Sequence, residues 1–227
     1  RLKSDANIQV VTNPSLSCSY MGFDLLNEHG SAGTDDPNPL LNVKVRQAIY
    51  HAIDIQTIID TVMNGYATVA NSYMPSICVG YNPDAERPAY DPELAKQLLA
   101  EAGYPDGFYL RIDARSDSDM NADQVSQAIA SYLEKVGITT EVNLLPRASF
   151  YEKVDAENLQ SSFFMAGWGD GSGEGMVIFN DMLYTYNGKP GMGEGNKGHY
   201  SNPEVDALLD EASVEADQDK RAALVEQ

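Results

Sequence analysis

Residues 108–145, FYLRIDARSDSDMNADQVSQAIASYLEKVGITTEVNLL, decide the fold of this chain. Their pattern predicts a strand over 108–112, a helix over 122–136 that ends at Gly137, and a strand over 138–145. Two strands joined through a helix at this spacing are typical of a βαβ unit. The sequence therefore predicts a layered α/β architecture.

The same alternation continues on both sides of this stretch. Downstream, the sequence predicts a helix over 149–156, a strand over 162–166 and a helix that opens at Asn202-Pro203. Upstream, it predicts two strands joined by a turn and three helices that begin and end at cap residues: strands 8–12 and 19–25 around Asn13-Pro14-Ser15, helices 43–53 and 55–63, and a helix from Asp91-Pro92 to Gly103.

The composition excludes several classes of protein. Of the 227 residues, 43% are apolar and 22% charged, as is usual for a globular protein. Aspartate and glutamate total 34 against 15 lysines and arginines, a formal net charge of −19. This charge repels nucleic-acid phosphates and anionic lipid, so we expect no nucleic-acid partner. No apolar run reaches the ~20 residues of a membrane span, and the N-terminus lacks the apolar stretch of a secretory signal.

Cysteine and histidine spacing gives no metal site. Cys18 and Cys78 match no ligand spacing and leave two alternatives open, buried thiols or one disulfide. His29, His51 and His199 are far apart in the sequence. We therefore expect neither a metal nor a cofactor.

The acidic cluster at 113–123 also fails as a calcium loop. An EF-hand loop that starts at Asp117 places Ala122 where the turn needs glycine and Ala128 where a bidentate carboxylate is needed. The cluster is better interpreted as acidic residues that complement the dipole at the start of the following helix.

A glycine-rich segment after the predicted strand 162–166 is the candidate ligand site. It lacks both a phosphate-binding loop pattern and a G-x-S-x-G nucleophile pattern. Its glycines let a ligand approach the backbone closely, Trp168 offers an apolar face, and Asp170 and Glu174 can accept hydrogen bonds from a cation or hydroxyl group. Loops at strand ends are where α/β proteins tend to bind ligands. The alternative is a flexible connector beside a core tryptophan.

Two other functions stay open at this point. Asp170 and Glu174 can be paired as acid and base of a hydrolase that acts on carbohydrate or peptide bonds. With 34 acidic residues such pairs arise by chance, so we do not expect an enzyme. An interaction module that uses its acidic face is the third hypothesis, and it predicts strongly salt-dependent binding.

Several stretches together resemble the large solute-binding proteins of bacterial and archaeal ABC importers, the family that includes oligopeptide-, dipeptide- and nickel-binding proteins. The matching pieces lie in order along the chain at 42–49, 51–54, 65–67, 90–107, 167–169 and 200–209. This resemblance implies an α/β, periplasmic-binding-protein-like II lobe with a mixed sheet flanked by helices, in a fragment of a two-lobed protein. It implies hinge-proximal strands at 1–28 that lead from a missing N-terminal lobe. Residues 29–227 would then form the second, C-terminal ligand-binding lobe, truncated at its C-terminus.

The resemblance also implies a function. The chain would help to capture a peptide or other small solute between two lobes and to deliver it to the membrane subunits of an ABC permease. The location would be periplasmic or extracellular, with a lipid anchor as an open alternative. Relatives that bind peptides often place an aspartate three positions after the tryptophan, where this chain has Gly171. Peptides, sugars or opines and metal chelates therefore stay open as ligands, at a site made of Trp168, Gly169, Asp170, Gly171, Ser172 and Glu174.

Overall fold

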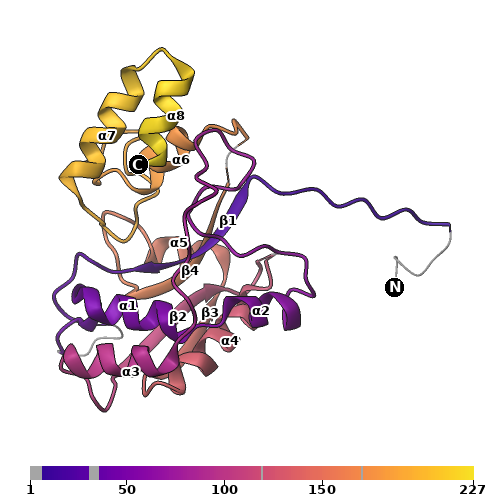
Figure 1. Cartoon of the computed structure of the whole chain (residues 1–227). Helices are drawn as coiled ribbons and strands as arrows, with labels where there is room; N and C mark the ends of the chain where they lie inside the picture. The colour runs from indigo at the N-terminus through magenta and orange to yellow at the C-terminus, as the bar shows by residue number, and fades with distance from the viewer. Residues whose placement is uncertain (1–6, 31–35, 119, 170) are drawn as a thin grey trace.

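The computed structural model describes residues 7–30, 36–118, 120–169 and 171–227 (Figure 1). Within these residues a four-stranded sheet has the strand order β1-β4-β2-β3. Strand β2 runs parallel to both β3 and β4, whereas β1 is antiparallel to β4, so the sheet is mixed. The strands are β1 (Ser17–Phe23), β2 (Tyr109–Arg115), β3 (Thr139–Leu145) and β4 (Phe163–Gly169).

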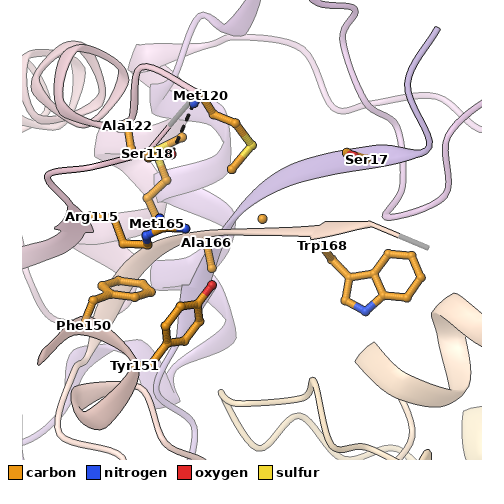
Figure 2. A pocket seen from close by; sticks show the side chains of 11 residues that line it. Ser17, Arg115, Ser118, Met120, Ala122, Phe150, Tyr151, Met165, Ala166 and Trp168 are labelled. Atoms are coloured by element: carbon orange, nitrogen blue, oxygen red, sulfur yellow. Dashed lines mark hydrogen bonds between the residues drawn. The ribbon is translucent and has the colours of Figure 1, made fainter. Parts of the chain in front are cut away.

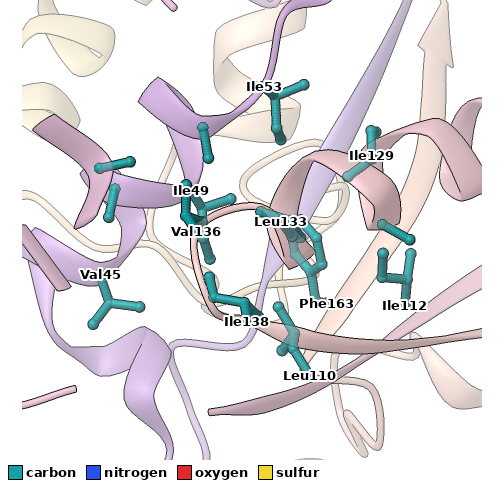
Figure 3. Packing of buried hydrophobic residues seen from close by; sticks show 14 of the residues in the cluster. Val45, Ile49, Ile53, Leu110, Ile112, Ile129, Leu133, Val136, Ile138 and Phe163 are labelled. Atoms are coloured by element: carbon teal, nitrogen blue, oxygen red, sulfur yellow. The ribbon is translucent and has the colours of Figure 1, made fainter. Parts of the chain in front are cut away.

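Helix α4 (Ala122–Glu134) connects β2 to β3 and completes the predicted βαβ unit. Its inward side chains Ile129 and Leu133 belong to the main core, together with Leu110 of β2 (Figure 3). Burying an aliphatic side chain of this size stabilises the fold by about 1.5–3 kcal/mol. The α/β architecture predicted from 108–145 is confirmed.

Three further helices complete this core: α1 (Val43–Ala52), α2 (Ile55–Thr61) and α3 (Pro92–Glu101). The predicted caps are present. Asp54 accepts a hydrogen bond from the Thr57 backbone N–H at 3.0 Å, and Asp91 accepts one from that of Leu94 at 2.9 Å. The hydrogen bonds that Thr57 donates hold the pKa of Asp54 below its ordinary value. A short 3-10 helix, η3 (Pro39–Leu41), leads into α1.

The remaining helices lie elsewhere on the sheet. Helix α5 (Arg147–Lys153) covers the face opposite α4, because Phe164, which packs on Phe150, alternates with the core residue Phe163 along β4. Helices α6 (Gly175–Met182), α7 (Pro203–Val214) and α8 (Gln218–Glu226) surround a second apolar cluster. Figure 1 shows this second group well apart from α1–α4.

Two predictions for the N-terminal segment are wrong. Residues 8–12 form no strand, and Figure 1 shows them leading away from the rest of the fold. No described strand lies beside them to pair with their backbone, and Val11 is 70% exposed. The next strand is also displaced: it ends at Phe23 instead of residue 25, because the Asp24 carboxylate accepts from the backbone N–H groups of Leu26 and Asn27 and turns the chain.

Strand β4 is longer than predicted. It continues from the expected end at residue 166 to Gly169, because β1 pairs with it over seven residues, from Phe23 opposite Phe163 to Ser17 opposite Gly169. Trp168 and Gly169 therefore belong to a strand and not to a loop. Helix α6, which starts within the glycine-rich segment at Gly175, was not predicted.

The proposed division at residue 28 stays a prediction. β1 lies within 1–28, yet Met21 and Phe23 pack against the main core, and the Phe23 ring stacks on Phe163 with 5.3 Å between centroids. Cys18 and Cys78 are thiols, so the structure does not form the disulfide left open above. Over the described ranges, no helix combines the length and the apolar character of a membrane span.

Candidate functional site

The sheet splits open at one end. β4 pairs with β2 only at Phe163 and Phe164, opposite Ile112 and Asp113. Beyond that point β2 stays paired with β3, and β4 stays paired with β1 as far as Gly169. Residues 165–169 therefore have β1 on one side and no strand on the other among the described residues. A strand edge of this kind presents unpaired backbone N–H and C=O groups.

A pocket of about 160 Å³ lies at this split (Figure 2). Figure 2 shows Met120 on one side of β4 and Tyr151 and Trp168 on the other, so the pocket wraps around the strand. Its walls come from β1, the end of β2, the turn after it, α5 and β4: Ser17, Arg115, Ser118, Met120, Ala122, Phe150, Tyr151 and residues 165–168.

The positive charge of this pocket comes from Arg115. Its side chain is 19% exposed and donates to the Asp117 carboxylate at 3.1 Å. That hydrogen bond raises the pKa of Arg115 and lowers the pKa of Asp117. The guanidinium groups of Arg115 and Arg147 also lie 5.8 and 5.6 Å from the centre of the Tyr151 ring. In a chain of net charge −19, this rim can attract an anionic group of a ligand.

Trp168 joins the pocket to the second apolar cluster. The indole is half-buried, packs against the cluster around α6 and also lines the pocket. Its Nε1–H donates to Asp181 Oδ2 at 2.5 Å, which fixes one edge of the ring. The tryptophan is thus not sealed inside a core, and the predicted role at an open site remains consistent with its position.

The other residues of the predicted site are not brought to the pocket. Gly169 is exposed beside Ser17, Asp170 lies outside the described residues, and Gly171 and Ser172 are exposed. The Glu174 carboxylate lies 3.9 Å from Arg221 of α8, and Glu174 does not line the pocket. Of the predicted set only Trp168 lines it, and ligand contact by the others stays a prediction.

Sequence reasoning missed Arg115, Ser118 and Met120. They lie in or next to 114–121, a stretch that matched no motif. A usable signal was present, because this stretch follows the carboxyl end of a strand parallel to β4, and parallel strands place their carboxyl ends at one edge of the sheet. That rule was applied to the segment after β4 but not to the segment after β2.

A second, larger pocket of about 460 Å³ lies near the start of β2. It combines Arg111 and Lys153 with the carboxylates of Asp24 and Glu28. Both cations also face the buried Asp113, with Arg111 Nε at 3.7 Å and Lys153 Nζ at 3.3 Å. Over the described residues, no group of three or more His, Cys, Asp or Glu side chains is arranged to hold a metal ion.

Comparison with known families decides the identity of the chain. The family model for bacterial extracellular solute-binding proteins, family 5 (middle region), matches residues 1–190. The chain belongs to this family. The resemblance inferred from the ordered motifs is therefore confirmed.

Curated family 5 relatives match nearly the whole chain. It is 31% identical over 231 residues to heme-binding protein A of Haemophilus influenzae, a match that covers 100% of this chain and 39% of the relative. It is 29% identical over 215 residues to a glutathione-binding protein of Shigella flexneri, covering 93% of this chain and 39% of the relative. The chain thus spans about two-fifths of the length of these proteins.

Solved structures of family 5 proteins share the fold. HbpA2 of Haemophilus parasuis superposes with a TM-score of 0.84 at 29% identity, over 100% of this chain and 42% of that one. A dipeptide-binding protein of Pseudoalteromonas in complex with Met-Leu gives a TM-score of 0.81 at 27% identity, over 98% and 42% of the two chains. The expected fold class, a lobe of the periplasmic-binding-protein type, is confirmed.

Proposed function

We propose that the chain forms one wall of a ligand cleft in the solute-binding component of an ABC importer, and that the solute is a short peptide. The observation that carries this proposal is the open edge of β4 at 165–169, next to Trp168 and the pocket. An extended peptide can add to such an edge as an extra strand, with main-chain hydrogen bonds that do not depend on its sequence.

The pocket suits one side chain of such a peptide. Phe150, Met165 and Ala166 give it an apolar lining, and Arg115 offers a charge to a carboxylate. Its volume of about 160 Å³ is well below the roughly 300–1,000 Å³ of a complete small-molecule site. A site of this size holds part of a ligand, and we place the remaining contacts on the lobe that would precede this chain.

Two walls also explain how binding would be read by a transporter. A ligand shifts the balance between open and closed forms only if it binds one of them more tightly. Contacts with both lobes meet this condition because they exist together only in the closed form. We propose that the closed form docks on the permease subunits, outside the cytoplasm, and that residues 1–28 lead from the first lobe.

A binding role is favoured over the hydrolase and the acidic interaction module. The named relatives are binding proteins, which supports the absence of catalysis. Glu174, one half of the suggested acid and base pair, faces Arg221 and does not line the pocket. No geometry in the described residues singles out the acidic surface as a docking face. Family 5 also supports a site outside the cytoplasm.

Titration of the 227-residue chain with Met-Leu tests this proposal. Trp168 is the only tryptophan, so its fluorescence reports directly on the pocket. We expect a saturable change with a Kd weaker than about 1 µM, or less than about 8 kcal/mol of binding free energy, because only one wall is present. Glutathione and heme serve as comparison ligands, and calorimetry provides a signal that does not depend on Trp168.

The outcomes separate the hypotheses. Stronger binding of heme or of glutathione than of any tested dipeptide would contradict the peptide assignment. Nanomolar affinity would contradict the two-wall arrangement. Recovery of cleaved Met-Leu after the titration would instead support the hydrolase, whereas we expect the dipeptide to be recovered intact.

A further inference from the structure

The Asp181 carboxylate binds two separate parts of the chain. Oδ2 accepts the indole N–H of Trp168 at 2.5 Å, and Oδ1 accepts the backbone N–H of Gly195 at 2.9 Å. Asp181 lies on α6, Trp168 on β4 and Gly195 in the irregular segment 184–200, which matched no known motif over 188–198. One side chain therefore connects the wall of the pocket to this segment.

The segment 184–200 is held firmly by polar contacts. Asn196 is buried and bonds the backbone C=O groups of Tyr184 and Tyr200, at 2.9 and 2.7 Å. The backbone N–H of Gly193 donates to the C=O of Asn180 at 2.7 Å. His199 has a left-handed backbone, with φ of +58°, which a side chain adopts only where the surroundings impose it. An ordered segment of this kind can serve as a fixed support for Asp181.

The chemistry of the two partners requires a carboxylate at position 181. Both the indole N–H and the Gly195 N–H are donors, and an ionised aspartate offers two acceptor oxygens. An asparagine has one acceptor oxygen and one NH₂ group, so one of the two donors would lose its partner. Hydrogen bonds to charged groups contribute about 1.5–3 kcal/mol, more than neutral ones.

We propose that Asp181 is a positioning residue for ligand binding: it holds the Trp168 indole against the pocket and ties the indole to the segment 184–200. This inference rests on the proposed function, because it assumes that the pocket at Trp168 is the ligand site. Asp181 itself does not line the pocket. Its effect on the ligand therefore passes through the orientation of the indole.

Calorimetric titration with Met-Leu tests the link to binding. Asp181→Asn is expected to raise the Kd about tenfold, corresponding to the loss of one hydrogen bond to a charged group. In a Trp168→Phe background the same substitution is expected to change the Kd less than about twofold, because phenylalanine has no N–H to hold. An equal effect in both backgrounds would overturn the proposal.

Asp210→Asn is the matched control. Asp210 accepts from the Tyr184 hydroxyl at 3.1 Å, so this change removes the same charge and one hydrogen bond next to the same segment without touching Trp168. Its Kd is expected to equal that of the wild type. A loss as large as that of Asp181→Asn would assign the effect to net charge and overturn the positioning role.

A second measurement needs no ligand. Acrylamide quenching of the single tryptophan should increase in Asp181→Asn and also in Gly195→Ala, whose new Cβ would press on the Asp181 carboxylate. Asp210→Asn should leave the quenching unchanged. Unaltered quenching in the first two variants, with folding verified by circular dichroism, would overturn the proposal. Absence of Met-Leu binding in the wild type would count against the proposed function, whereas the quenching result would still decide the role of Asp181.

Discussion

Replacing Asp113 by alanine is expected to lower the free energy of unfolding by about 3–5 kcal/mol. Asp113 is 1% exposed, and it accepts from the Asn143 amide and the Ser161 hydroxyl, each at 2.6 Å. Lys153 and Arg111 are the cations that face it. The substitution leaves these cations and both donors without their shared acceptor, and unpaired buried groups are costly.

The same substitution should reach the ligand site. Lys153 is the last residue of α5, which also carries Phe150 and Tyr151 of the pocket. Because Asp113 ties this helix to β2, we expect weaker peptide binding even under conditions where the variant remains folded.

Urea unfolding followed by circular dichroism measures the stability change. Asp60→Ala is the control, because Asp60 is an exposed aspartate that bonds the Gln56 side chain, and its loss should cost less than about 0.5 kcal/mol. A loss below about 1 kcal/mol for Asp113→Ala would show that the buried network is not a main support of the sheet.

Replacing Gly167 by valine is expected to weaken peptide binding at least about tenfold, or by about 1.4 kcal/mol, with little change in stability. Gly167 is an exposed residue of β4 that lines the pocket. A Cβ there meets the end of the flexible Met120 side chain, which can move aside. The added methyl groups then occupy the pocket, while a β-branched residue suits the strand.

Calorimetry with Met-Leu, together with a thermal unfolding curve, tests this prediction. Thr139→Ile is the control, because it adds apolar bulk to an exposed position on β3, which lies outside the pocket. Its affinity should match that of the wild type. Undiminished binding by a folded Gly167→Val variant would move the ligand away from this pocket.

Much of the architecture could be predicted because its signals are local. The cap residues Asp54 and Asp91 mark helix starts through hydrogen bonds to residues three positions away. Gly137 ends the pattern of α4 in the same local way, with φ of +96°. Such contacts are written in the neighbouring sequence, so the βαβ unit was recognised from 108–145 alone.

The candidate site depended on contacts between distant residues. β4 extends to Gly169 because β1, far away in sequence, pairs with it, and no local pattern records that partner. The pocket exists because β4 leaves β2 after Phe164, which is a property of the sheet as a whole. Trp168 was identified by its residue type and place in a motif, whereas Arg115 and Asp181 acquire their positions only through the fold.

An amide-resolved NMR titration of the chain with Met-Leu is the most direct test of the central claim, that a peptide lies along the free edge of β4. We predict that the largest shifts occur at the backbone amides of Gly167, Trp168 and Gly169 and at the Trp168 indole N–H. Amides around Arg111 and Lys153 should remain unchanged. Saturable binding that shifts those amides while leaving 165–169 in place would contradict the account.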